Sequence, residues 1–180
     1  MKDILDKAAK IKLLIFDVDG VLTDGSLYLG KEGEEYKAFY ARDGLGMTML
    51  QSTGVTIGII TARNSPVVTH RMQSLGIEHV LQGKHDKLTA FKQLTEKLQL
   101  DYQQVAYLGD DLIDVPVMRQ VGLAIAVADA DVLTIKHAHW QTQAAGGRGA
   151  AREVCELIMK AQGTWSKQLS RYSIEQSIIC

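Results

Sequence analysis

The sequence lacks the features that mark several classes of protein. Its 180 residues carry a formal net charge of -1, which gives no electrostatic reason to expect a nucleic acid or an anionic membrane as a partner. No apolar run reaches the length of a membrane span, and there is no internal repeat, low-complexity tract or linker. We therefore expect a cytoplasmic protein that binds neither nucleic acid nor a membrane.

Cysteine is almost absent. Cys155 lies in a helical pattern and Cys180 at the C-terminus, and neither has metal-ligand spacing. Two cysteines do not make a disulfide framework, so we interpret them as one core thiol and one tail thiol. The histidines also lack any pair at metal-ligand spacing, and we expect them to be structural or exposed. They are His70, His79, His85, His137 and His139.

The remaining composition, 46% hydrophobic and 23% charged, suits one globular domain over residues 1–180, with residues 163–180 as a C-terminal tail. Apolar strand-like runs alternate with amphipathic helical ones, and several runs are apolar on both faces, as in a buried parallel sheet. The predicted strands are 12–16, 56–60, 79–81, 105–108 and 123–127. This alternation predicts an α/β fold with a doubly wound, mainly parallel sheet, which binds ligands outside the carboxyl ends of its strands.

The two prolines predict the starts of two helices. Ser65 precedes Pro66 as a helix N-cap precedes a proline in the first turn, and Pro116 fits a first turn in the same way. Between them, an apolar stripe made of Leu88, Phe91, Leu94 and Leu98 predicts another helix.

Residues 25–40 interrupt the alternation. Two short apolar runs flank Gly30-Lys31-Glu32-Gly33, which predicts a β-hairpin with a glycine-rich turn. The hairpin is too short to be a separate cap domain. We expect it to expose apolar side chains that pack against a neighbouring subunit, the alternative being a hairpin folded onto its own domain. These side chains are Leu27, Leu29, Tyr36, Phe39 and Tyr40.

A pair of carboxylates follows the first predicted strand. Asp17 and Asp19 share one face where the strand ends, and Gly20 lets the backbone come close to a ligand. Two neighbouring carboxylates repel unless a cation joins them. A hard divalent ion next to a nucleophilic carboxylate indicates phosphoryl chemistry, although a simple acidic turn is an alternative.

Other strand ends supply the remaining parts of such a site. Thr61 ends the second strand and can donate a hydrogen bond to a phosphate oxygen, and Asp110 follows the fourth strand and can complete a metal site. Lys87 opens the helix after the third strand, where its ammonium can face a cleft anion rather than the core. Each residue alone has an ordinary structural explanation, but their order along the chain favours a phosphoryl-transfer site.

The substrate-binding residues are less strongly indicated. Arg63 and Asn64 follow Thr61 and could reach a phosphate or a substrate carboxylate. Arg42 and Arg148 are weaker candidates of the same kind, and the glycines around Arg148 suggest a mobile loop.

With these motifs in order across residues 12–127, the sequence resembles the haloacid dehalogenase superfamily of phosphohydrolases. The resemblance implies that Asp17 is a nucleophile that forms an aspartyl-phosphate and that Asp19 is the general acid and base. It further implies that Thr61 and Lys87 bind the phosphate and contribute to catalysis.

The same resemblance implies a Mg²⁺ cofactor. Its ligands would be the Asp17 and Asp110 carboxylates and the backbone carbonyl of Asp19, with Asp111 and Asp114 as supporting acids. Five further segments narrow the resemblance to phosphatases of 3-deoxy-D-manno-octulosonate 8-phosphate (KDO 8-phosphate). This resemblance implies a capless homotetramer that acts in lipopolysaccharide precursor synthesis. The segments are 16–25, 42–46, 86–87, 109–114 and 146–153.

Several alternatives stay open at this level. The substrate could be another sugar acid phosphate, such as a 9-phosphorylated sialic acid, and the chemistry could be that of a phosphomutase, although no cap is present to retain an intermediate. A phospho-acceptor receiver domain also combines acids, magnesium, threonine and lysine, but carries its acceptor aspartate on a middle strand. A non-catalytic scaffold would require decayed acids, and here they are intact.

Overall fold

A parallel sheet forms the centre of the computed structural model, which describes residues 1–174. Its order is β5-β4-β1-β6-β7-β8, and every neighbouring pair is parallel. The strands are β1 (Leu13–Phe16), β4 (Thr56–Ile60), β5 (His79–Leu81), β6 (Val105–Gly109), β7 (Leu123–Ala126) and β8 (Trp140–Gln141). The five predicted strands are confirmed to within one residue at each end. Strand β8 is only two residues long and was not predicted.

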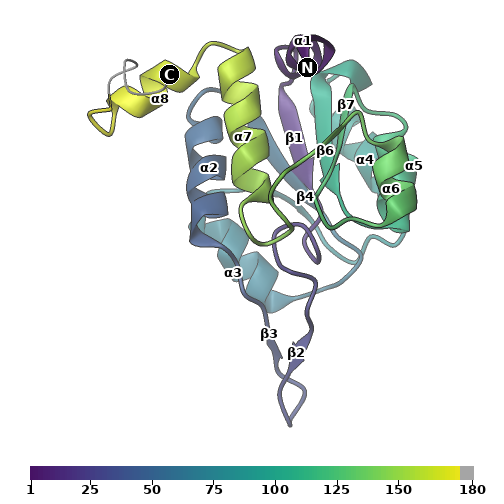
Figure 1. Cartoon of the computed structure of the whole chain (residues 1–180). Coiled ribbons are helices and arrows are strands. Elements are labelled where there is room, and N and C mark those ends of the chain that lie inside the picture. Colours follow the sequence, from purple (N-terminus) through teal and green to yellow (C-terminus); the bar gives the residue numbers. More distant parts are fainter. Residues whose placement is uncertain (175–180) are drawn as a thin grey trace.

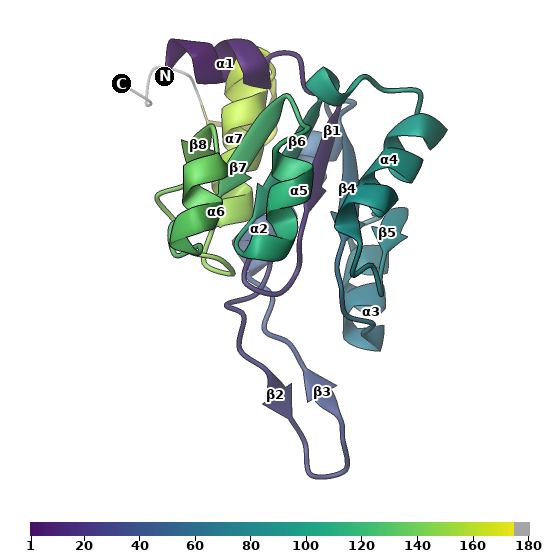
Figure 2. The ribbon, with the colours of Figure 1, turned by 90° about the vertical axis from the view of Figure 1, so that its right-hand side faces the viewer.

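Helices cover both faces of the sheet, so the predicted doubly wound α/β fold is confirmed (Figures 1 and 2). One face carries α1 (Lys2–Ala8), α2 (Ala41–Gln51), α3 (Pro66–Ser74) and α7 (Ala150–Ala161). The other carries α4 (Lys87–Lys97), α5 (Val115–Met118) and α6 (Val132–His137). Short 3-10 turns, η1 (Tyr102–Gln104) and η2 (Leu112–Asp114), precede β6 and α5.

The alternation of side chains along β1 builds the two cores. Leu14 and Phe16 belong to the core under α2 and α7, whereas Leu13 and Ile15 belong to the core under α4 and α5, because successive side chains of a strand point to opposite faces. β1 lies between β4 and β6, where the chain changes direction across the sheet. A ligand site in such a sheet lies at this switch point, beyond the carboxyl end of β1.

The predicted helix starts are largely confirmed. Pro66 and Pro116 lie in the first turns of α3 and α5. Ser65 is the N-cap residue of α3, as predicted, although its side chain makes no capping hydrogen bond. In α4, Phe91 and Leu94 of the expected apolar stripe are buried.

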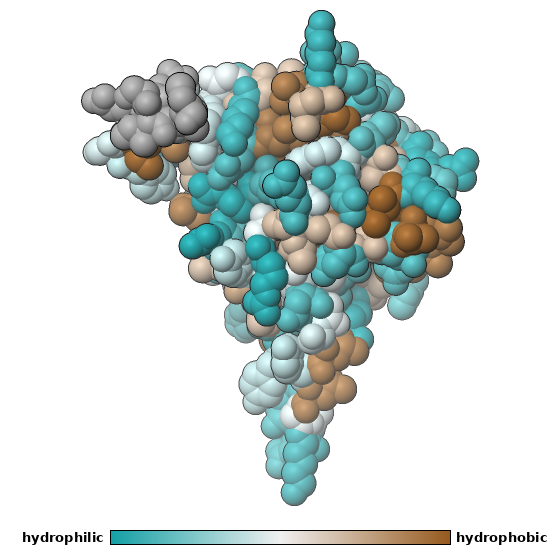
Figure 3. Space-filling view, viewed as in Figure 1, coloured by the Kyte–Doolittle hydropathy of each residue, from teal (hydrophilic) through white to brown (hydrophobic). Residues whose placement is uncertain are grey.

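The hairpin projects away from the body of the molecule (Figures 1 and 2). It consists of β2 (Tyr28–Leu29) and β3 (Glu35–Tyr36), paired antiparallel. Leu27, Leu29 and Tyr36 are exposed as expected, and hydrophobic residues lie along one side of the hairpin (Figure 3). Phe39 and Tyr40 do not fit the expectation. Both are half-buried, and Phe39 packs against the main core, because the chain has already returned to the domain there.

Part of the expected tail folds onto the domain. Helix α8 (Trp165–Ser170) buries Leu169, and the Trp165 ring lies 5.8 Å from the Arg152 guanidinium carbon. Cys155 is fully buried, as predicted, and burial raises the pKa of its thiol. Cys180 lies outside the described residues. Among residues 1–174, none of the helices combines the length and apolar character needed to cross a membrane.

Candidate active site

Two loops meet at the carboxyl end of the sheet. Asp17 follows β1, and its Oδ1 accepts a hydrogen bond of 2.6 Å from the backbone N–H of Val18. Gly20 adopts a φ of +89°, and a Cβ there would lie only 2.1 Å from Oδ2 of Asp110, in the loop after β6. The glycine therefore gives room to a carboxylate of this chain, a role more specific than the ligand approach expected from the sequence.

Lys87 lies between two carboxylates. Its Nζ is 2.7 Å from Oδ2 of Asp17 and 2.7 Å from Oδ1 of Asp114, and its side chain is fully buried. Burial alone would lower the pKa of Lys87, but the two carboxylates outweigh burial and raise it, so the ammonium stays charged. The lysine does face a cleft anion. The side chain that carries the ammonium to this anion is nevertheless buried.

Asp114 organises the floor of the site. Its Oδ1 accepts hydrogen bonds from Lys87 Nζ and from the hydroxyl of Tyr107 at 2.6 Å. Its Oδ2 accepts from the backbone N–H groups of Asp110 at 3.0 Å and Asp111 at 3.3 Å. A carboxylate offers about four acceptor positions, and these four bonds occupy them. Asp114 thus holds Lys87, Tyr107 and the backbone of the loop after β6 together.

Asp111, the other expected supporting acid, makes no hydrogen bond to Lys87 or Tyr107 within the part of the chain that the structure describes. It is exposed, and its Oδ1 accepts from the backbone N–H of Leu112 at 2.7 Å at the start of η2. Tyr107 was not predicted as a site residue, because a tyrosine in an apolar run has the pattern of a core residue. In the structure the Tyr107 side chain is fully buried and connects that strand to the acid cluster.

The carboxylates Asp17 and Asp110 have the properties of cation ligands. One oxygen from each, together with one from Asp114, lies within 4.8 Å of the others. Burial and then the Asp114 charge raise the pKa of Asp17 to about 7, and burial and then the Asp17 charge raise that of Asp110 to about 8. Oδ1 of Asp110 is buried and has no hydrogen-bond partner among the described residues. A hard divalent cation would satisfy this oxygen and offset the repulsion.

A cavity of about 260 Å³ opens above these groups. It is lined by Asp17, Asp19, Gly25, Thr61, Ala62, Arg63, Asp110, Asp111 and Ile113. Thr61 is buried at the end of β4, and Arg63 is exposed at the rim. The fold therefore brings together the acid pair, the hydroxyl, one candidate arginine and the acid cluster, with Lys87 directly beneath Asp17.

Asp19 has partners that the sequence analysis missed. Lys37, just after β3 of the hairpin, forms an ion pair with Oδ1 of Asp19 and another, at 3.2 Å, with Oε1 of Glu35. Arg63 donates to the same Glu35 oxygen at 2.9 Å. The sequence contained an indication of this contact, because Glu35 and Lys37 are two residues apart in a strand-like run and so share a face.

The other candidate substrate residues lie outside the cavity lining. Arg148 is exposed and lies 3.4 Å from Oδ2 of Asp24. Arg42 is exposed, with its guanidinium carbon 6.0 Å from the Tyr40 ring centroid. Asn64 is exposed after β4.

The segments around Arg42 and Arg148 have a packing function. Buried Asp43 accepts from the backbone N–H groups of Gly149 at 3.3 Å and Arg152 at 2.8 Å, and so satisfies the start of α7 from helix α2. Gly46 lets the two helices approach, because a Cβ there would lie 2.8 Å from the Arg152 side chain. Gly146 is buried, and its Cβ would collide with the Gly20 carbonyl. Close packing therefore accounts for this glycine, which the sequence analysis had assigned to a mobile loop.

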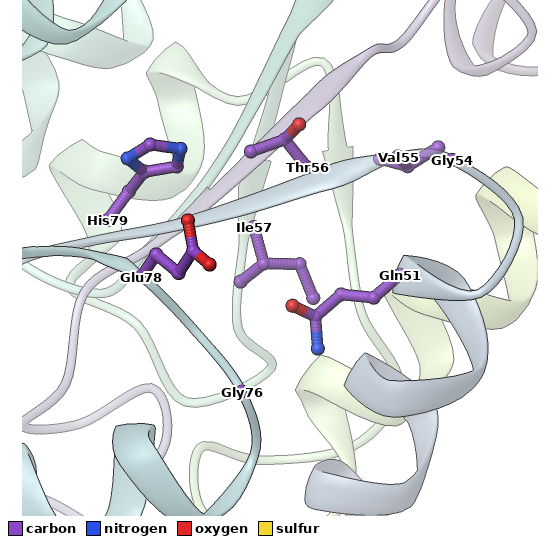
Figure 4. Close-up of a pocket in the computed structure, with 8 residues that line it drawn as sticks. All are labelled: Gln51, Gly54, Val55, Thr56, Ile57, Gly76, Glu78 and His79. Carbon is purple, nitrogen blue, oxygen red and sulfur yellow. The ribbon is translucent and has the colours of Figure 1, made fainter.

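A second cavity of about 280 Å³ lies at the opposite end of β4 (Figure 4). Its lining includes Thr56 at the amino end of that strand, Gln51 from α2, Glu78 just before β5 and His79 at the start of β5. The full length of β4 separates it from Thr61, so it takes no part in the carboxylate site.

Comparisons with known proteins agree with this geometry. Residues 76–153 match a family of haloacid dehalogenase-like hydrolases. The chain is 53% identical over 161 residues to the KDO 8-phosphate phosphatase of Escherichia coli K12, covering 89% of this chain and 86% of that enzyme. The corresponding enzyme of Yersinia pestis is 52% identical over 160 residues, with the same coverage.

Solved structures give the same result. A probable phosphatase from Pseudomonas syringae superposes with a TM-score of 0.95 at 51% identity, covering 98% of this chain and 100% of that one. The KDO 8-phosphate phosphatase of Moraxella catarrhalis, determined with magnesium, phosphate and KDO, has a TM-score of 0.94 at 44% identity, covering 96% of this chain and 99% of that one. These likenesses exclude the alternative that the chain is a receiver domain. The chain belongs to the family of KDO 8-phosphate phosphatases within the haloacid dehalogenase-like hydrolases.

Proposed function

We propose that this chain is a Mg²⁺-dependent phosphomonoesterase that releases phosphate from KDO 8-phosphate, a step of lipopolysaccharide precursor synthesis. One observation carries the proposal. Asp17 lies against Lys87 and Asp110 on the floor of the cavity, in a chain that shares about half of its residues with phosphatases of that substrate.

Asp17 is the proposed nucleophile. Its carboxylate attacks phosphorus in line, the bond to the sugar oxygen breaks, and an aspartyl-phosphate forms. Lys87 and the Thr61 hydroxyl bind phosphoryl oxygens and stabilise the charge that develops on them. Asp19 donates a proton to the leaving alkoxide and then accepts one from the water that hydrolyses the aspartyl-phosphate, so one residue serves both half-reactions.

The cation would be held by the Asp17 and Asp110 carboxylates and by the backbone carbonyl of Asp19. The unpartnered Asp110 oxygen and the raised pKa values of both carboxylates support this ligand set. Bound Mg²⁺ supplies the positive charge that lets an anionic nucleophile approach an anionic phosphate ester. Asp114 holds Lys87 and the Asp110 backbone in place beneath it.

Arg63 is the residue of this chain that we propose for substrate selection. It lines the cavity rim, and its guanidinium can bind a carboxylate or phosphate in bidentate fashion. The chain would act in the cytoplasm as a homotetramer. The exposed apolar hairpin supports an assembly, since a hairpin of this size is marginal in water without a packing partner.

A phosphate-release screen tests the proposal. Purified protein with Mg²⁺ should release phosphate from KDO 8-phosphate faster than from other sugar phosphates, including a 9-phosphorylated sialic acid. Asp17→Asn should abolish release, because an amide neither attacks as a carboxylate nor binds the metal as well. Faster turnover of the nine-carbon substrate would reassign the substrate, and normal turnover by Asp17→Asn would reject the mechanism.

Sedimentation tests the assembly separately. We expect a tetramer, and a paired substitution that introduces charge at Leu27 and Leu29 should dissociate it. A wild-type monomer with full activity on the sugar acid phosphate would contradict the proposed assembly.

A further inference from the structure

The hairpin carries a buried cation into the active site. Lys37 follows β3, and its side chain is only 1% exposed although the hairpin itself projects into solvent. Lysine is almost never fully buried unless it is paired. Here its ammonium contacts the carboxylates of Asp19 and Glu35.

A second cation connects the same two carboxylates. Arg63, beyond the end of β4, donates to Oε1 of Glu35 at 2.9 Å, and its Nε lies 3.9 Å from Oδ2 of Asp19. We call Asp19, Glu35, Lys37 and Arg63 the hairpin charge network. It contains two cations and two anions, so its formal charge is zero. Arg63 is 45% exposed, and thus Lys37 is the cation that water screens least.

We propose that Lys37 is a positioning residue for Asp19, and that through it the hairpin holds the Asp19 carboxylate where it can transfer a proton to the leaving group. The inference rests on the proposed function, in which Asp19 is the general acid and base. A proton-transfer group must lie within hydrogen-bond reach of its target. Lys37 holds one oxygen of this carboxylate, whose other oxygen has only the longer, more exposed contact with Arg63.

A purely structural explanation predicts a different result. If Lys37 only anchors the hairpin, its removal should weaken binding or folding and affect every phosphate ester alike. If it positions Asp19, its removal should slow most those substrates whose leaving group needs a proton. The value of kcat/KM reports steps up to departure of the leaving group, so it isolates this half-reaction from hydrolysis of the aspartyl-phosphate.

The experiment uses a series of aryl phosphates, from p-nitrophenyl to p-methylphenyl phosphate, that differ in leaving-group basicity and little in size. For Lys37→Met, kcat/KM for p-methylphenyl phosphate should fall by about 10-fold to 100-fold, a part of the 10²–10⁴-fold that general acid catalysis contributes. The value for p-nitrophenyl phosphate, whose leaving group departs without a proton, should change little. In this variant kcat/KM should therefore fall more steeply as the basicity of the leaving group rises.

Three matched variants complete the design. Lys37→Arg keeps a cation, so its kcat/KM should depend only weakly on leaving-group basicity, as in the wild type. Glu35→Gln loosens the network but leaves the contact between Lys37 and Asp19, so the dependence should stay that of the wild type. Lys31→Met removes an exposed lysine from the hairpin turn and should change nothing. Circular dichroism identifies the variants that fold, and Lys37→Gln replaces Lys37→Met if the latter does not.

The two proposals fail in different ways. A wild-type protein that releases no phosphate from any ester would reject the proposed function. An active wild type whose Lys37→Met or Lys37→Gln variant loses the same factor on every aryl phosphate would reject the positioning role and leave the phosphatase assignment intact.

Discussion

Replacing Lys87 by methionine removes the ammonium that lies between two buried carboxylates. Lys87 and Asp114 are fully buried and Asp17 is 6% exposed at its side chain, so water screens neither 2.7 Å ion pair effectively. Removing one partner of a buried ion pair costs about 3–5 kcal/mol, because the remaining charge stays buried without compensation. Methionine keeps most of the side-chain volume, so the loss should not include a large cavity.

Part of this cost can be recovered by protonation. The pKa of Asp17 is already raised to about 7, chiefly by burial, and loss of the lysine raises it further. Below that pKa the carboxyl accepts a proton and the repulsion from Asp114 falls. We therefore expect the loss in unfolding free energy to lie near the lower end of the range under mildly acidic conditions and near the upper end above neutrality.

Urea unfolding followed by circular dichroism measures the loss, with and without Mg²⁺. Lys92→Met, on the exposed side of the same helix, is the matched control and should stay within about 0.5 kcal/mol of the wild type. Activity per folded molecule should also fall by about 10²–10³-fold, as for the loss of one preorganised charge. A Lys87→Met variant as stable as the Lys92→Met control would refute the inference that the buried ammonium stabilises the fold.

Two further results are expected. Tyr107→Phe removes one of the hydrogen bonds to Asp114 and should destabilise the protein by about 1.5–3 kcal/mol, the usual range for a hydrogen bond to a charged group, as thermal unfolding will measure; a change close to zero would show that Tyr107 only fills space. In Mg²⁺-free protein, the pKa values of Asp17 and Asp110 are raised to about 7 and about 8. Between about pH 4 and pH 8 these two carboxyls therefore bind more protons in the folded state than in the unfolded chain. The free energy of unfolding should therefore fall as the pH rises through that window, while Mg²⁺ affinity by calorimetry should rise because binding displaces those protons. A Mg²⁺ affinity that does not change with pH would contradict the assignment of these two carboxylates as ligands.

The positions of the main site residues follow from the local sequence. The sequence alone shows three apolar runs that end next to polar residues. One ends at Asp17, another ends at Thr61 and a third leads into Asp110. In a parallel sheet the carboxyl ends of the strands meet at one edge. The alternation of strands and helices therefore already places these three side chains in one region, and the structure confirms that they line one cavity.

Residues that act through distant contacts were not predictable in this way. Tyr107 has the pattern of a core residue, and only the packing of η2 against β6 brings Asp114 to its hydroxyl. For Arg42 and Arg148 a role as anion ligands stays a prediction, but nothing in the sequence indicated that their segments form the junction of α2 with α7, where Asp43 and Arg152 are 109 residues apart in the sequence.

Five of the six strands of the sheet, and the acids that follow two of them, were therefore predictable from the sequence, because strand periodicity and apolar runs are local properties of the chain. Tertiary structure decided which charges neutralise one another. Lys37 reaches Asp19 across 18 residues and Lys87 reaches Asp114 across 27. Such pairs form only where the hairpin returns to the domain and where α4 packs against α5, because an ion pair depends on the distance between its atoms in space and not along the chain.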